Sequence, residues 1–206
     1  MFNVAVLSPS SGKCEFGYAL SLANLVLNFA TNRIEEGEGV QGMQIVGQQS
    51  FSTSCNREML IDWAITKDFS HVLFIDDDMS FEPSVLVDLA RRGKDFIVCN
   101  YPRKKVPLSF ISIGLDGKEI VTDKESSGVE EAGQVGFGMA LIKMDVIKAV
   151  PKPRFPLPFN SATGEYGSED YWFCKTARDK GFHIYIDHDA SKKIGHIGSF
   201  TYKGGW

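Results

Sequence analysis

The chain has 206 residues, of which 43% are hydrophobic and 23% charged. These proportions are ordinary for one soluble globular domain and exclude a disordered chain. The net charge of −4 argues against a protein that binds mainly to nucleic-acid phosphates. No apolar run approaches the ~20 residues that span a bilayer, and the first residues lack the basic segment of a signal peptide. Four widely spaced cysteines without a C-x-x-C motif predict reduced thiols in a cytoplasmic protein.

The first half of the chain alternates apolar strands with helices. Strands are expected at 2–7, 43–46, 72–75 and 96–99, and helices at 19–29, 54–65 and 83–90. Ser54 is expected to cap the second helix, and Pro83 suits the first turn of the third. The alternation predicts an α/β fold with a mostly parallel sheet, right-handed crossovers and flanking helices. Ligands of such sheets bind at the carboxyl ends of the strands.

The second half predicts a smaller mixed or antiparallel β part. Hairpin strands are expected at 110–113, 119–122 and 129–135, a further strand at 138–143 and a late strand at 184–186. A short helix is expected at 145–150, and four prolines stiffen the loop at 151–158. Ser168 is expected to cap a helix that Gly181 ends, whereas the tail from His196 onward shows no clear element.

Three consecutive carboxylates, Asp76, Asp77 and Asp78, follow the strand at 72–75. They repel one another and need a counter-charge, which a divalent metal ion supplies. Asp76 and Asp78 point the same way in an extended chain, and hard oxygen ligands suit Mg²⁺ or Mn²⁺. The alternative is an acidic loop in which Asp78 caps the next helix. A second polar cluster, at 8–12, follows the first strand in the same way.

A different chemistry fits the same carboxylates. A strand that ends in Asp-x-Asp also resembles the nucleophile loop of haloacid-dehalogenase-type phosphatases, with Asp76 as the nucleophile and Asp78 as the acid. That loop normally follows the first strand of its fold, whereas here it follows about the third. The chain also has no later Gly-Asp-x-x-x-Asp motif.

Two further features carry possible chemistry. Glu169 and Asp170 open a predicted helix, whose dipole favours their ionised forms; they either cap the helix or provide a general base for an incoming hydroxyl. His196 follows Gly195, and Gly198 comes soon after it, so the backbone there can approach a ligand closely. His196 is therefore a candidate third metal ligand, or a structural histidine. Lys203 either covers a phosphate or is a solvated lysine.

Four motifs in this order resemble the small glycosyltransferases of the glycosyltransferase-A fold, such as bacteriophage, viral and bacterial surface-sugar enzymes. The motifs are Asp76-x-Asp78, Gly136-Phe137-Gly138, Ser168-Glu169-Asp170 and His196. Cys55-Asn56-Arg57 also resembles the start of the helix that precedes their donor site. The resemblance covers almost the whole chain. It implies one domain over 1–206, with a nucleotide-binding half at about 1–105 and a sugar- and acceptor-binding half at about 106–206.

The resemblance implies transfer of a sugar from a nucleotide-diphosphate sugar, UDP-linked before GDP-linked, to a hydroxyl of a carbohydrate, glycan or other acceptor, with Mn²⁺ or Mg²⁺ as cofactor. It implies the metal ligands Asp76, Asp78 and His196. The implied donor-binding residues are Ser8, Pro9, Ser10, Arg57, Asp76, Asp77, Gly136, Gly138 and Lys203. Asp170 would deprotonate the acceptor and Glu169 would orient the sugar or acceptor. These roles imply inversion, although the His196–Lys203 spacing also resembles retaining enzymes.

Two further functions stay open beside the phosphatase. One is a non-catalytic carbohydrate- or protein-binding module of the same fold. The other is a glycosyltransferase that acts on a nucleic-acid base, because Arg103-Lys104-Lys105 forms a compact basic run. The preferred interpretation of that run is a solvated loop, so nucleic acid is not expected as a partner.

Overall fold

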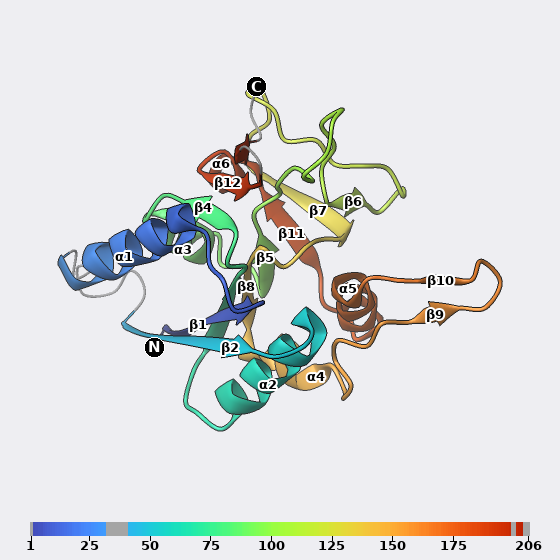
Figure 1. Cartoon of the computed structure of the whole chain (residues 1–206), viewed down its shortest axis with the longest axis horizontal. Helices are drawn as coiled ribbons and strands as arrows, with labels where there is room; N and C mark the ends of the chain where they lie inside the picture. The colour runs from blue at the N-terminus through green and yellow to red at the C-terminus, as the bar shows by residue number, and fades with distance from the viewer. Residues whose placement is uncertain (1, 32–40, 199–200, 204–206) are drawn as a thin grey trace.

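The computed structural model describes residues 2–31, 41–198 and 201–203, and its centre is one large mixed sheet (Figure 1). The strand order is β2-β1-β3-β8-β5-β11-β7-β6. The strands are β1 (Asn3–Ser10), β2 (Gly42–Gln49), β3 (His71–Ile75), β5 (Phe96–Val98), β6 (Ile113–Gly114), β7 (Val129–Gln134), β8 (Met139–Lys143) and β11 (Ile184–Asp187).

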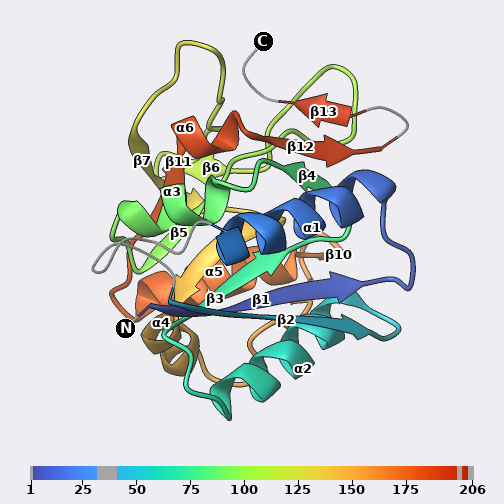
Figure 2. The same cartoon turned by 90° about the vertical axis from the view of Figure 1, so that its left-hand side faces the viewer.

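Helices cover both faces of this sheet, which gives the molecule three layers (Figure 2). One layer consists of α2 (Thr53–Ile65), α4 (Met144–Ala149) and α5 (Glu169–Asp179), and the other of α1 (Phe16–Thr31), α3 (Val85–Arg91) and α6 (His188–Ser191). Successive residues of a strand face opposite sides. In β1, Ala5 and Leu7 therefore join the core beside α2, whereas Val4 and Val6 join the core beside α1.

Two small sheets complete the fold. The antiparallel sheet β13-β12-β4 joins β4 (Met79–Phe81), β12 (Ile194–Ile197) and β13 (Thr201–Lys203). The hairpin of β9 (Phe159–Asn160) and β10 (Glu165–Tyr166) projects from the body of the molecule just before α5 (Figure 1). None of the helices in the described part of the chain is long and apolar enough to cross a membrane.

The structure confirms an α/β fold and the alternating elements of the first half, but it corrects the pairing of the sheet. β1 is parallel to β2 and β3, whereas β8 lies antiparallel between β3 and β5. β8 can take this central place because residues 139–142 are all buried, and a strand with two apolar faces must be covered on both sides.

Three local predictions are also corrected. The α2 cap is Ser52 rather than Ser54, because the Ser52 side chain accepts a hydrogen bond from the Cys55 backbone N–H at 3.2 Å. Residues 119–122 form no strand and contribute a single β-bridge, Ile113 with Glu119. The tail does contain structure: His196 lies in β12, whose partner β4 is more than a hundred residues earlier in the chain, so no local pattern signals it.

Candidate functional site

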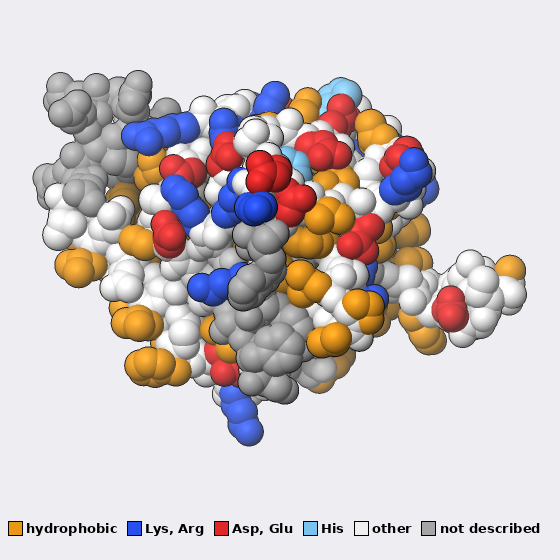
Figure 3. Space-filling view, turned by 90° about the horizontal axis from the view of Figure 1, so that it is seen from above, with side chains coloured by type: hydrophobic (Ala, Val, Ile, Leu, Met, Phe, Trp, Pro, Cys, Tyr) orange, Lys and Arg blue, Asp and Glu red, His pale blue; other side chains and the backbone are white. Residues whose placement is uncertain are grey.

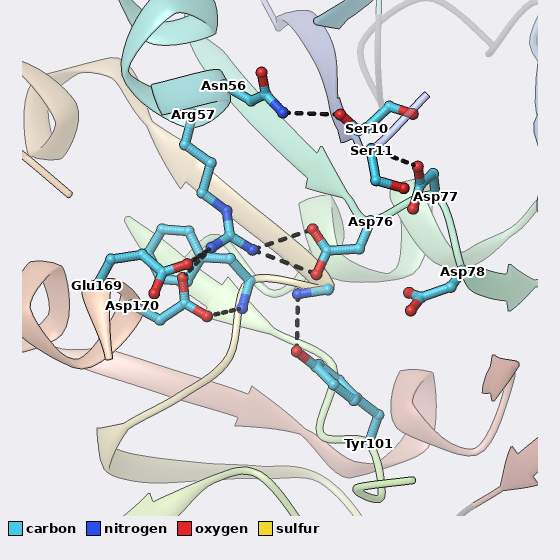
Figure 4. A network of polar contacts seen from close by, with 12 residues as sticks. Ser10, Ser11, Asn56, Arg57, Asp76, Asp77, Asp78, Tyr101, Glu169 and Asp170 are labelled. Atoms are coloured by element: carbon cyan, nitrogen blue, oxygen red, sulfur yellow. Dashed lines mark hydrogen bonds and ion pairs between the residues drawn. The ribbon is translucent and has the colours of Figure 1, made fainter. Parts of the chain in front are cut away.

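A buried arginine joins three carboxylates from two other segments of the chain (Figure 4). Arg57 of α2 is 2% exposed. Its Nη2 lies 3.1 Å from Oδ1 of Asp76, which directly follows β3. Its Nη1 lies 2.8 Å from Oε1 of Glu169 and 2.5 Å from Oδ1 of Asp170, the first two residues of α5. We call these four residues the arginine cluster. It brings together two sequence motifs that are about ninety residues apart.

Local structure holds the arginine cluster in place. Asn56 Nδ2 donates to the backbone oxygen of Ser10 at 2.9 Å, which ties the start of α2 to the carboxyl end of β1. The second oxygen of Asp170, Oδ2, accepts from the backbone N–H of Phe137 at 3.3 Å. The Phe137 ring packs against the guanidinium of Arg57 at 5.5 Å, a cation–π distance. The cluster therefore rests on β1, α2, α5 and the turn before β8.

The charges of the arginine cluster do not balance, because three carboxylates share one guanidinium. Burial raises the pKa of Asp170 to about 7, although Arg57 opposes this shift. Burial also raises the pKa of Asp76, again against the effect of Arg57. Burial tends to lower the pKa of Arg57, but Asp170, Asp76 and Glu169 outweigh it and keep the guanidinium charged. Asp170 is thus a carboxyl group that can exchange a proton near neutral pH.

A hollow of ≈ 500 Å³ lies beside this cluster. Its lining residues come from the end of β3, from the segment between β5 and β6, and from β12. They are Asp76, Asp78, Tyr101, Arg103, Lys104, Lys105, Ile111 and His196. Carboxyl ends of strands are the edge where α/β sheets bind ligands. The hollow therefore combines two carboxylates, a histidine and three cationic side chains at that edge.

Asp78 and His196 meet in the hollow, but Asp76 does not join them. His196 Nε2 lies 3.4 Å from Oδ2 of Asp78, whereas both oxygens of Asp76 contact Arg57. The predicted three-residue metal site is therefore not assembled, and no group of three or more His, Cys, Asp or Glu side chains placed to hold a metal ion occurs among the described residues. Lys104 Nζ contacts Asp78 instead. Burial tends to raise the pKa of Asp78, but His196 and Lys104 outweigh it and lower this pKa.

The ring of His196 is oriented for a ligand on one nitrogen. Its Nδ1 lies 2.9 Å from the backbone oxygen of Pro102, and a carbonyl oxygen can only accept, so Nδ1 carries the proton. The other ring nitrogen, Nε2, then faces Oδ2 of Asp78 at 3.4 Å. Histidine ligands of metal ions are commonly held in this way by their second nitrogen.

The two glycines around Phe137 leave room for Tyr101 rather than for an open space. A Cβ at Gly138 would lie 2.7 Å from Cζ of Tyr101, and a Cβ at Gly136 would collide with the Tyr101 hydroxyl. That hydroxyl accepts a hydrogen bond from the Gly138 N–H at 3.1 Å. In this structure both glycines therefore serve the close packing of Tyr101.

Replacing Gly138 by Ala is expected to destabilise the protein by about 1–3 kcal/mol, because Tyr101 is buried and cannot move aside without strain. Gly47→Ala is the control, since a Cβ there meets only a backbone oxygen at 3.8 Å. Urea unfolding of both variants measures the difference. Equal stabilities for the two variants would show that the Tyr101 ring yields.

The other predicted donor residues are dispersed. Ser8 is buried and its hydroxyl bonds to that of Tyr18; Pro9 and Ser10 form the end of β1. Asp77 accepts from the backbone N–H of Ser11 at 3.3 Å. Lys203 lines a separate hollow of ≈ 210 Å³ beside β4. The structure therefore places none of these side chains on the hollow that contains Asp78.

Five lining residues are not among the predicted site residues, namely Tyr101, Arg103, Lys104, Lys105 and Ile111, and one signal could have found two of them. Tyr101 and Lys104 follow the carboxyl end of β5, just as Asp76 and Asp78 follow β3. The rule that ligands bind at strand ends applies equally to both segments. Lys104 was expected to be solvated with its neighbours. On the face seen in Figure 3, Lys and Arg side chains lie interleaved with Asp and Glu rather than in one basic patch.

Comparison with known proteins supports the fold alone. The chain is similar to the solved structure entitled "Crystal Structure of A197 from STIV", with a TM-score of 0.61 and 18% sequence identity over 96% of this chain and 86% of that one. No family model and no curated protein matches the sequence.

Proposed function

We propose that this chain is a metal-dependent glycosyltransferase of the glycosyltransferase-A fold. It would move a sugar from a nucleotide-diphosphate sugar, UDP-linked before GDP-linked, to an acceptor hydroxyl with inversion. The observation that carries the proposal is the pairing of two groups at one sheet edge. Asp170 is a carboxyl that is only 14% exposed and has a pKa of about 7, and Asp78 with His196 forms an oxygen and nitrogen donor pair in the adjoining hollow.

The donor pair fits Mn²⁺ or Mg²⁺. Mg²⁺ in proteins is usually held by one or two carboxylates together with substrate phosphates and water, so Asp78 and His196 supply enough ligands when a diphosphate supplies the rest. When bound, such an ion acts as a Lewis acid that stabilises negative charge on the departing diphosphate. Asp76 stays with Arg57 and contributes negative charge to the wall of the hollow.

Asp170 would be the general base. Its Oδ1 is held by Arg57 and its Oδ2 by the Phe137 N–H, so the carboxylate has a fixed direction. It would accept the proton of the acceptor hydroxyl as that oxygen attacks the sugar carbon opposite the diphosphate. A base with a pKa near the working pH combines a useful ionised fraction with proton affinity. Glu169 contacts the same Nη1 of Arg57 as Asp170 does and would add negative charge beside the base.

Arg57 itself would not touch the donor. Its guanidinium is buried and bonded to three carboxylates, so it acts as a positioning residue that connects α2, β3 and α5. This role differs from the phosphate contact that the resemblance implies. A phosphatase mechanism with Asp76 as nucleophile gains no support, because both oxygens of Asp76 contact Arg57.

The proposed function is tested by calorimetric titration of UDP and GDP with and without Mn²⁺, followed by a screen of nucleotide sugars for release of the nucleotide. We expect saturable UDP binding that depends on Mn²⁺, and turnover of at least one nucleotide sugar. Nucleotide binding with the same affinity in the presence and absence of Mn²⁺, or no turnover of any nucleotide sugar, would contradict the proposal.

Asp78→Asn should weaken Mn²⁺-dependent UDP binding at least about tenfold, because an amide is a poorer ligand for a hard cation than a carboxylate. Asp95→Asn is the matched control, since Asp95 precedes β5 at the opposite edge of the sheet and pairs with Lys143. Calorimetry on both variants checks this expectation. Wild-type affinity in Asp78→Asn would exclude Asp78 as a ligand.

A further inference from the structure

Lys104 and Asp78 form an ion pair inside the hollow that the proposed function assigns to a cation. Nζ of Lys104 contacts Oδ2 of Asp78, the oxygen that also lies 3.4 Å from Nε2 of His196. The two side chains of the pair are 33% and 30% exposed. The ammonium group is therefore the cation that neutralises Asp78 in this structure, and it contacts the oxygen that faces the histidine.

Lys104 can leave this position without disturbing its loop. Its neighbour Arg103 anchors the loop, because Nε donates to the backbone oxygen of Phe110 at 3.1 Å and Nη2 donates to the Tyr171 hydroxyl at 3.1 Å. The backbone N–H of Arg103 also donates to Ser109 at 2.7 Å. Within the described part of the chain, the hydrogen bond and ion pair of the Lys104 side chain are both made with Asp78. Movement of Lys104 therefore breaks one polar contact and leaves the anchors of the loop in place.

We propose that Lys104 and a divalent cation compete for Asp78, and that the displaced ammonium then binds the diphosphate of the donor. The inference rests on the proposed function, since it takes Asp78 and His196 as ligands. Two cations at one carboxylate oxygen repel each other, so binding of either favours release of the other. Asp78 and the diphosphate would lie in the same hollow. A charge-assisted contact between the ammonium group and a phosphate would then replace the contact with Asp78.

The first test is a titration of the protein with Mn²⁺ alone, followed by electron paramagnetic resonance of the free ion. Lys104→Met should bind Mn²⁺ about fivefold more tightly than the wild type, because the competing ion pair is gone. Lys105→Met is the matched control: it removes the same charge from the same hollow but no ion pair with Asp78. The Mn²⁺ affinity of Lys105→Met should exceed that of the wild type by less than about twofold. Equal gains for the two variants, or no gain, would overturn the competition.

The second test measures UDP binding at saturating Mn²⁺ by calorimetry. Lys104→Met should now bind about tenfold more weakly than the wild type, since a charge-assisted contact to the diphosphate is lost. A residue with a merely structural role would not shift the two affinities in opposite directions. Wild-type affinity for UDP would overturn the exchange of partners.

The outcomes separate this inference from the proposed function. Saturable Mn²⁺ binding by the wild type with no gain in Lys104→Met overturns the inference alone. Mn²⁺ binding that occurs only together with UDP also overturns the inference alone, because Lys104 then shows no competition at the free site. If neither the wild type nor the Lys104 variant binds Mn²⁺ even with UDP present, the metal site fails, and both the inference and the proposed function fall with it.

Discussion

Replacing Arg57 by Met is expected to lower the free energy of unfolding by about 3–5 kcal/mol at pH 8, because removal of one partner leaves buried charges without compensation. Three carboxylates, those of Asp76, Glu169 and Asp170, depend on this guanidinium. In a chain of this length the loss corresponds to a melting temperature about 10 °C lower. Urea unfolding and thermal melting measure both quantities. An exposed ion pair provides the control: Lys175→Met, which breaks the Lys175–Asp179 pair, should cost less than about 1 kcal/mol.

A second substitution separates the effect of uncompensated charge on stability from the effect of lost side-chain packing. Asp170→Asn in the Arg57→Met background should recover part of the stability, because it removes one of the uncompensated charges. The loss should also shrink at pH 5, where Asp170, whose pKa is raised to about 7, takes up a proton. A loss of the same size at both pH values, with no recovery in the double variant, would show that packing alone is responsible.

The sequence predicts most of the strands and helices of the first half because their signals are local. Apolar runs and turn residues mark β1, α1, β2, α2, β3, α3 and β5 without reference to the rest of the chain. The pairing of β8 between β3 and β5 has no such signal, since an apolar run reads the same in a parallel and an antiparallel strand. The same holds for β12, whose pairing with β4 joins distant segments.

In the candidate site, too, the sequence predicts what has a local signal and does not predict contacts between distant residues. Asp76, Asp78, Glu169, Asp170 and His196 stand out from the sequence because acidic or glycine-flanked residues follow strands or open a helix. What the sequence does not predict is which of them meet. The contacts of Arg57 reach 19 residues to Asp76 and 113 to Asp170, so only the folded chain shows that Asp76 and Asp170 share this guanidinium. The contact between Lys104 and Asp78 joins residues that are 26 positions apart, so the sequence predicts a solvated Lys104 instead.

Replacing Asp170 by Asn should reduce the rate of sugar transfer about 10²–10⁴-fold, the contribution of a general base. The affinity for UDP and Mn²⁺ should stay within about threefold of the wild type, since Asp170 does not line the hollow with Asp78 and His196. Release of UDP from the donor found in the screen, measured at single turnover, gives the rate. A variant that keeps the full rate would exclude Asp170 as the base.

The pH dependence of the wild type provides a second readout. If the base is Asp170, kcat/KM should rise with pH through about 7 and level off above it, because only the ionised carboxylate accepts a proton. The rise should be absent from the residual activity of Asp170→Asn. A wild-type profile that is flat between pH 5.5 and 8.5 would contradict the assignment.

The same substitution should stabilise the protein in alkaline solution. The pKa of Asp170 is raised from its ordinary value of 3.8 to about 7 in the folded state, so the folded protein binds this proton more tightly than the unfolded chain. The stability that the proton contributes is complete below about pH 4 and is lost as the pH rises through 7. Asn carries no charge at any pH, and Asp170→Asn should therefore unfold with a free energy about 1–2 kcal/mol higher than the wild type at pH 8. The gain should be smaller at pH 5 and should vanish only below about pH 4. Urea unfolding at the two pH values measures this difference. A variant that is both slower in sugar transfer and more stable at pH 8 would show that the charge of Asp170 serves catalysis at a cost in stability.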